Sequence, residues 1–239
     1  RLSVAFGSDF ADLFEVRGQK RERRGLTTCE RISDQAAALT YVGLDDVART
    51  TTVHFTPKPR TLDASSASYE LTLEPQGQFK LFLAIVCSAE GDAVKTDIGY
   101  HQSINAARRA LDTASARATR IGGSNSRFNH LLSRSLSDLY MLITDTPHGP
   151  YPYAGIPWFS TAFGRDGLLT ALFTLWIDPA IAAGVLRYLA ATQAAAEDPA
   201  RDAEPGKMLH ETRAGEMAVL REVDKLDKRG PDYVRETLT

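Results

Sequence analysis

The chain has 239 residues, of which 43% are hydrophobic and 24% are charged, and its formal net charge is −2. This length is enough for one large domain or two ordinary ones with a buried core. The near-neutral charge gives no electrostatic reason to expect nucleic acid or an anionic membrane as a partner, and no apolar run approaches the roughly 20 residues of a membrane-spanning helix.

The first 98 residues alternate between apolar and polar side chains, which is typical of strands. Leu2, Val4 and Phe6 share one face, for example. Residues 69–73 and 79–85 are predicted to form an antiparallel hairpin around the turn residues Pro75, Gln76 and Gly77. We therefore expect about six strands of an incomplete β-sandwich domain over residues 1–98, with further strands upstream.

The hydrophobic period then changes to that of helices. A linker helix is expected within residues 99–123 and is broken by Gly122, Gly123 and Ser124. An all-helical domain is expected over residues 124–239. Its predicted helices run from a cap at Asn125 or Ser126 to Ile143, from Asp166 to Ile177, and from Pro179 to Ala196, with a proline-rich loop before Asp166.

A basic run, "EVRGQKRERRG", follows the first predicted strand. It could bind phosphate or nucleic acid, or it could be a solvated turn between strands, and we favour the turn because surface charge runs are usually solvated. Asp9, Asp12 and Glu15 lie beside it without the spacing of a calcium loop, so we expect turn and strand-edge carboxylates.

The sequence offers little support for metal or cofactor chemistry. It contains no His-x-x-x-His or Cys-x-x-Cys pair, no Gly-x-Ser-x-Gly elbow and no phosphate-binding glycine loop, so we expect neither a metal nor a cofactor. A disulfide between Cys29 and Cys87 stays open, although two isolated cysteines are more typical of reduced thiols. With no secretory signal at the start, we expect a soluble, cytoplasmic protein.

Two motifs carry the side chains that proteins use to bind sugars. Aromatic faces stack on pyranose rings, and planar bidentate groups bind neighbouring hydroxyls. "PYAGIPWFSTAFGRDG" and "GKMLHETRAGEM" supply both kinds of group, in Trp158, Phe159, Arg165, Asp166, His210, Glu211 and Arg213. The alternative is structural: Asp166 would be a carboxylate at a helix N-terminus, stabilised by the helix dipole, with Arg165 as its surface partner.

These motifs closely resemble those of the bacterial and archaeal glycogen debranching enzymes of the amylo-α-1,6-glucosidase type. "GIPWFSTAFGRDGLLTAL" and "GKMLHETRAGEMA" resemble their catalytic domain, and "DFADLFEVRGQKRERRG" resembles their N-terminal β-rich domain. The resemblance spans roughly residues 1–220. It implies a β-sandwich, a linker helix and the first helices of an (α/α)₆ barrel. The end of the chain, "VLREVDKLDKRGPDYVRETLT", departs from the family pattern, and we expect a truncated fragment that begins inside a longer gene product.

The resemblance also implies the activity, which is hydrolysis of α-1,6-linked glucose branch stubs on glycogen or another branched α-glucan. Arg165 and Asp166 would hold the terminal glucose, Trp158 and Phe159 would line its pocket, and His210, Glu211 and Arg213 would form a neighbouring wall. The catalytic acid and base are expected in later barrel loops, so none is assigned and this chain alone is expected to be inactive. Two alternatives stay open: a non-catalytic glucan-binding or scaffold protein, and a related α-glucosidase acting on trehalose or maltooligosaccharides. The oligomeric state is not predicted.

Overall fold

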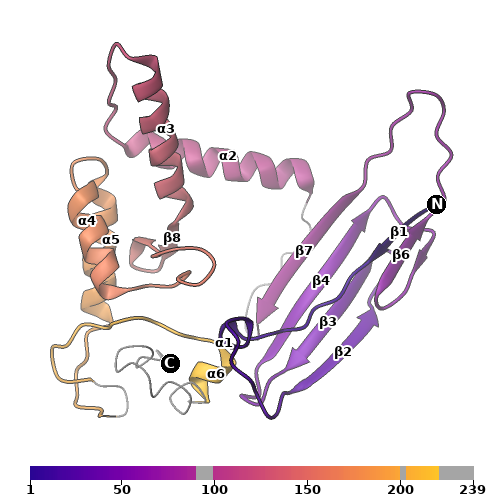
Figure 1. The fold of residues 1–239 in the computed structure, drawn as a ribbon, viewed down its shortest axis with the longest axis horizontal. Helices are drawn as coiled ribbons and strands as arrows, with labels where there is room; N and C mark the ends of the chain where they lie inside the picture. Colours follow the sequence, from indigo (N-terminus) through magenta and orange to yellow (C-terminus); the bar gives the residue numbers. More distant parts are fainter. Residues whose placement is uncertain (90–98, 200–202, 221–239) are drawn as a thin grey trace. The chain divides into compact units, whose positions relative to one another are not determined.

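A computed structural model describes residues 1–89, 99–199 and 203–220 of the chain (Figure 1). The chain divides into two compact units, residues 1–105 and 106–239. The first unit contains antiparallel sheets and the second contains most of the helices. The prediction of a mixed fold, with strands preceding helices, is confirmed at this level. The departing C-terminal segment from residue 221 onward lies outside the described residues.

The first unit is built on two sheets. The strands of the smaller sheet, in the order β1-β6-β5, are Leu2–Ala5, Ser66–Tyr69 and Thr61–Leu62. The strands of the larger sheet, in the order β2-β3-β4-β7, are Leu26–Arg31, Ala36–Val42, Ala48–Thr56 and Phe82–Ala89. Every pairing in the two sheets is antiparallel, and β2, β3, β4 and β7 lie side by side in Figure 1.

Both sheets contribute side chains to one hydrophobic core. Leu39, Val53 and Phe55 come from the larger sheet. They cluster with side chains of the smaller sheet, including Tyr69, whose hydroxyl donates to the carbonyl of Pro57 at 3.0 Å. The alternating pattern of the sequence therefore identifies the buried face of β4 correctly, at Val53 and Phe55. On β7 it does not, since the apolar side chains of Leu83 and Ile85 are 45% and 65% exposed.

The predicted hairpin between residues 69–73 and 79–85 is wrong. β6 ends at Tyr69, and β7 begins at Phe82 and pairs with β4 in the other sheet. The predicted turn does exist, since Gly77 N–H donates to the carbonyl of Glu74 at 2.8 Å. Because the chain crosses from one sheet to the other here, apolar side chains such as Phe79 pack on the core without a backbone ladder.

The basic run is more ordered than a solvated turn. It begins within the short helix α1, Leu13–Val16, where Asp12 and Glu15 form a reciprocal capping box. The Glu15 carboxylate also lies 3.7 Å from the guanidinium of Arg21 and 3.5 Å from that of Arg24. Only 1% of the Arg21 side chain is exposed, so the prediction of a solvated turn is wrong at this arginine. Glu15 is the first residue of the run, but its contact with the buried Arg21 depends on the local fold, which composition alone does not show.

The helices follow in chain order. They are α2 at Tyr100–Arg117, α3 at Ser126–Met141, α4 at Gly164–Thr174, α5 at Pro179–Ala191 and α6 at Glu216–Val219. The Asn125 cap of α3 is confirmed, because its side chain accepts from the N–H groups of Arg127 and Phe128. The start of α5 is also confirmed, with Asp178 as the N-cap and Pro179 in the first turn.

Several helix boundaries differ from the prediction, and α3 ends at Met141 rather than Ile143. α4 begins and ends earlier, because Phe163 is held in extended backbone by a bridge to Glu211 and the helix starts directly after it. α5 ends at Ala191 rather than Ala196. Beyond it, Ala194 N–H donates to the carbonyl of Lys207 at 3.0 Å, so the backbone there is satisfied by a distant segment and not by a further helical turn.

The proline-rich loop contains a hairpin that the sequence analysis missed. β8, Ile143–Thr146, pairs with β9, Gly149–Pro152. Prolines argue against strands because they lack an N–H. Here Pro150 and Pro152 are two residues apart, so both nitrogens face the outer edge, while Tyr153 N–H donates inward to the carbonyl of Leu142 at 2.9 Å. A two-stranded ribbon tolerates this pattern because each strand has a free edge.

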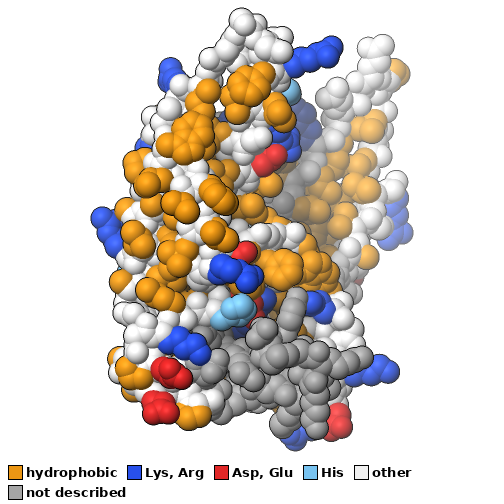
Figure 2. Space-filling model, turned by 60° about the vertical axis from the view of Figure 1, so that its left-hand side comes forward, with side chains coloured by type: hydrophobic (Ala, Val, Ile, Leu, Met, Phe, Trp, Pro, Cys, Tyr) orange, Lys and Arg blue, Asp and Glu red, His pale blue; other side chains and the backbone are white. Residues whose placement is uncertain are grey.

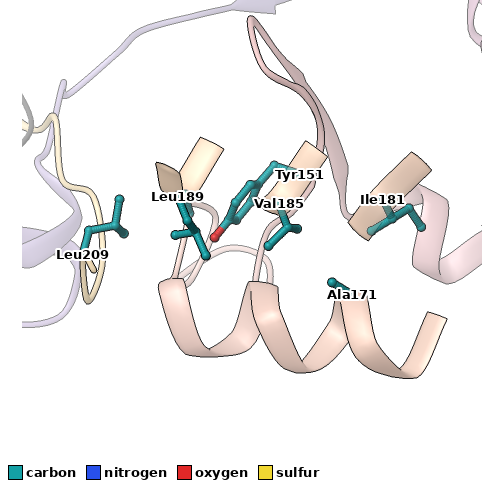
Figure 3. Packing of buried hydrophobic residues seen from close by; sticks show 7 residues of the cluster. Tyr151, Ala171, Ile181, Val185, Leu189 and Leu209 are labelled. Carbon is teal, nitrogen blue, oxygen red and sulfur yellow. The ribbon is translucent and has the colours of Figure 1, made fainter. Parts of the chain in front are cut away.

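The core of the second unit lies where β9 meets α4 and α5. Its buried residues are Tyr151, Ala162, Ala171, Ile181, Val185, Leu189 and Leu209. Figure 3 shows the Tyr151 ring beside Val185 and Leu189. The core therefore extends to Leu209, which belongs to the second of the two motifs predicted to bind sugar.

The outer side of α4 is apolar and exposed. Leu172 is 63% exposed and Phe173 is 69% exposed, and Trp176 just after the helix is 61% exposed. Hydrophobic side chains also gather on the face of the molecule shown in Figure 2. The sequence of α4 is apolar almost throughout, but only one side of the helix is buried in this chain.

Candidate functional site

The first part of the candidate site is the loop before α4. Gly155 and Phe159 form an isolated bridge in which Gly155 N–H donates to the carbonyl of Phe159 at 3.1 Å. The Ile156–Pro157 peptide bond in this turn is cis. Trp158 is half-buried and Phe159 is 38% exposed, so both rings retain surface that a ligand could contact.

The second motif lies directly beside this loop. Gly164 N–H donates to the carbonyl of His210 at 2.9 Å, and Thr212 N–H donates to the carbonyl of Ala162 at 3.1 Å. The hydroxyl of Thr161 donates to the carbonyl of Thr212 at 2.7 Å. Two segments about fifty residues apart in sequence are thus joined by backbone hydrogen bonds at the start of α4.

A buried ion pair reinforces this junction. The Arg213 guanidinium donates to one carboxylate oxygen of Glu211 from Nη2 at 2.7 Å and from Nε at 3.1 Å. Its Nη1 donates to the backbone carbonyl of Trp158 at 3.2 Å. Glu211 is 3% exposed and Arg213 is 8% exposed. Arg213 therefore contacts both the Glu211 carboxylate and the backbone of the Trp158 loop, so this ion pair connects the two segments of the candidate site.

Arg165 and Asp166 are placed differently. They occupy the first turn of α4 after its N-cap, Phe163. The side chain of Arg165 is 76% exposed and that of Asp166 is 42% exposed, and their closest charged atoms are 3.9 Å apart. An exposed pair this far apart contributes little to stability. Its polar atoms are therefore available to an external ligand, although the helix dipole also favours a carboxylate in the first turn.

Aromatic rings connect these groups. Phe163 contacts Phe159 with ring centroids 5.9 Å apart and His210 with centroids 6.1 Å apart, in both cases edge to face. The Arg213 guanidinium lies over the Phe163 ring, 5.6 Å from its centroid. Phe163 was not among the predicted site residues. Its place at the centre of the aromatic group could not be read from spacing, because it depends on the bridge to Glu211.

Tyr151 is a second residue that the sequence analysis missed. Its hydroxyl donates to the carbonyl of Phe163 at 2.9 Å, at the N-terminus of α4. Burial raises the pKa of the Tyr151 hydroxyl strongly, and the nearby Tyr188 and the Asp166 carboxylate raise this pKa further. Gly167 leaves room for this hydroxyl, because a Cβ at that position would lie 2.4 Å from the Tyr151 oxygen. Tyr151 and Gly167 together fix the helix end that carries Arg165 and Asp166.

Among residues 1–89, 99–199 and 203–220, no group of three or more His, Cys, Asp or Glu side chains is arranged to hold a metal ion. Cys29 and Cys87 are exposed free thiols in the first unit, so the disulfide left open by the sequence is not formed.

No helix in the described part of the chain combines the length and hydropathy needed to cross a bilayer.

Two comparisons with known proteins give matches. One is to the curated "Histidine--tRNA ligase" of Stenotrophomonas maltophilia (strain K279a), with 87% identity over 23 residues. That match covers 10% of this chain and 5% of the relative, which is too short to define a domain. The other covers the whole sheet region up to the start of β7. Over residues 1–84 the chain is similar to the family described as the N-terminal domain of some glycogen debranching enzymes.

Proposed function

We propose that this chain is part of a glycoside hydrolase of glycogen debranching, which removes α-1,6-linked glucose branch stubs, and that its second unit carries part of the sugar-binding site. The family match over residues 1–84 supports the glycogen theme. The proposal includes a β-sandwich over residues 1–98, a linker helix over 99–123 and the start of an (α/α)₆ barrel over 124–239. It also includes a bacterial or archaeal origin and a cytoplasmic location.

One observation carries the assignment of the sugar site. The exposed pair Arg165 and Asp166 stands at the start of α4, where backbone hydrogen bonds and the buried ion pair join the loop of Trp158 and Phe159 to the segment of His210. Aromatic faces beside a planar guanidinium and a carboxylate are the groups that stack on a pyranose and bind its hydroxyls. A rigid junction also lowers the entropic cost of ordering these groups on binding.

The roles then divide by exposure. Arg165 and Asp166 bind hydroxyls of the terminal glucose, and Trp158, Phe159 and His210 line its pocket. Glu211 and Arg213 act mainly by holding the Trp158 loop, since their charged atoms are buried against each other. This last role replaces the direct contact with sugar that the family resemblance implied, and it stays a proposal.

Hydrolysis needs two further groups. In inverting glycosidases a carboxylic acid protonates the leaving oxygen and a second carboxylate activates water, with the two carboxyl groups about 6.5–9.5 Å apart. Glu211 is committed to Arg213, and Glu216 in α6 is 3% exposed. We therefore assign neither as acid or base. The resemblance places both groups in later barrel loops, so we expect this chain alone to bind glucan without releasing glucose from a branched dextrin.

Retardation of the purified chain in native gels containing glycogen tests the binding site. The chain has two tryptophans, which supply a matched pair of variants. Trp158→Ala should weaken retardation, whereas Trp176→Ala, at a side chain 61% exposed beyond the end of α4, should leave it unchanged. Equal retardation of the two variants, or none for the unsubstituted chain, would overturn the proposed site.

A further inference from the structure

We propose that the first unit carries a second, separate glycan-binding site on its larger sheet. A cavity of about 720 Å³ lies over β4 and β7 at the start of α2. This volume is within the range of ligand pockets, roughly 300–1,000 Å³. The side chains and backbone that line it belong to Gln35, His54, Phe55, Thr56, Phe82, Leu83, Ala84, Gly99, Tyr100, His101, Gln102 and Ser103.

The strand register places this cavity on the side of the sheet away from the core. His54 lies opposite Ala84, and Thr56 lies opposite Phe82. Because side chains alternate along a strand, these four residues share one face. The intervening Val53 and Phe55 point to the buried core. Four of the strand residues that line the cavity therefore belong to the outer face, while Phe55 and its partner Leu83 line it from the other set of side chains.

The lining identifies the chemical class of ligand. None of the described lining residues is Asp, Glu, Lys or Arg, so the described lining contributes no carboxylate, ammonium or guanidinium group to a ligand. It offers instead imidazoles, amides and hydroxyls, from residues such as His54, Gln102 and Ser103. Such groups both donate and accept hydrogen bonds, which matches the hydroxyls of a neutral carbohydrate.

Aromatic rings form one wall. Phe82 and Tyr100 contact each other with ring centroids 5.0 Å apart and planes 31° apart, and His101 packs edge-on against Tyr100 at 5.3 Å. Tyr100 is still 54% exposed, so most of its ring is not used in this packing. An exposed ring, held by its neighbours and flanked by neutral hydrogen-bonding groups, provides a platform for a pyranose.

The choice of an α-glucan as ligand rests on the proposed function. The aromatic and hydrogen-bonding lining of the cavity is independent of it. The test is calorimetric titration of the full chain with maltoheptaose, in a Trp158→Ala background that weakens the site of the second unit. Residual binding is expected in this background. Adding Tyr100→Ala should weaken it roughly 3- to 10-fold, as expected for loss of one aromatic contact.

Two further substitutions keep the test interpretable. Tyr100→Phe retains the ring and should restore most of the affinity. Ile85→Ala alters an exposed residue of β7 outside the cavity lining and should have no effect. Circular dichroism of each variant checks that the sheets are retained.

The outcomes separate the two sites. If Trp158→Ala abolishes binding and the unsubstituted chain binds, the second site is overturned and the site of the second unit stands. If Trp158→Ala changes nothing and Tyr100→Ala abolishes binding, the proposed function loses its site and the present inference stands. Unchanged binding on adding Tyr100→Ala overturns the inference.

Discussion

Arg213 binds Glu211 and the Trp158 backbone at the same time, from a position where both charged residues are almost fully buried. This contact ties the segment "GKMLHETRAGEM", residues 206–217, to the loop that carries Trp158. The candidate site consequently depends on a pair of charges that does not face the expected ligand.

Removing one member of this pair should be strongly destabilising. Arg213→Ala leaves the Glu211 carboxylate buried without its main partner, which typically costs about 3–5 kcal/mol. Urea unfolding followed by tryptophan fluorescence reports on the second unit, because both tryptophans lie there.

The matched control is Arg165→Ala. That side chain is 76% exposed, and its loss should change the free energy of unfolding by no more than about 0.5 kcal/mol. Equal effects of the two substitutions would contradict the structural role of Arg213.

Gly167→Ala should disturb the start of α4. The new Cβ would lie 2.4 Å from the Tyr151 hydroxyl oxygen, so the tyrosine must move and lose its hydrogen bond to Phe163. Overpacking of this kind typically costs about 1–3 kcal/mol, against a small gain in helix propensity. Thermal unfolding measures the loss. Gly155→Ala, whose Cβ would approach Phe159 no closer than 3.9 Å, is the control and should be nearly neutral.

Tyr140 should make the stability of the second unit depend on pH under alkaline conditions. Burial raises the pKa of its hydroxyl from 10.0 to about 12, and the Asp178 carboxylate, which accepts the hydroxyl's hydrogen bond at 3.1 Å, contributes to the rise. Below pH 10 the hydroxyl is protonated in the folded and unfolded states, and its contribution is complete. Between pH 10 and about 12 the unfolded chain loses this proton first, so the contribution is lost as the pH rises.

Denaturant unfolding of the unsubstituted chain and Tyr140→Phe at a series of pH values tests this point. The two curves should differ most below pH 10 and converge toward pH 12. A constant difference across that interval would show that the raised pKa is not coupled to folding.

The exposed apolar side of α4 should accept polar residues. Leu172→Gln with Phe173→Gln removes two side chains that are 63% and 69% exposed, so the free energy of unfolding should change by only about 0.5 kcal/mol. Binding of a hydrophobic dye should fall, because the exposed apolar patch becomes smaller. A large loss of stability would mean that these side chains are packed in solution.

Local chemistry allowed parts of this structure to be predicted from the sequence. Asn125 and Pro179 correctly predicted the starts of α3 and α5, because a helix N-terminus is determined by contacts among a few neighbouring residues. The prediction of a hairpin after Tyr69 was wrong because the tertiary fold decides which strands pair. Alternation alone does not show which sheet a strand joins. The β8–β9 hairpin was not predicted for a related reason. Pro150 and Pro152 argue against a strand, and only the register shows that their nitrogens face outward.

The candidate site divides in the same way. Its residue types were visible in the two motifs, and the structure places the motifs side by side. The burial of Arg213 and Glu211 and the contacts of Phe163 and Tyr151 were not visible, because each depends on a partner distant in sequence. The binding of sugar by Trp158, Phe159, Arg165, Asp166 and His210 stays a prediction.

The most direct test of that prediction uses Trp158 as its own reporter. In a Trp176→Phe background Trp158 is the sole tryptophan, and titration with maltoheptaose should change its fluorescence with saturable binding. Asp166→Asn should weaken the affinity about 10-fold or more, as expected for a hydrogen bond to a charged group. No change in Trp158 emission, or an affinity unaffected by Asp166→Asn, would contradict a sugar-binding site at the start of α4.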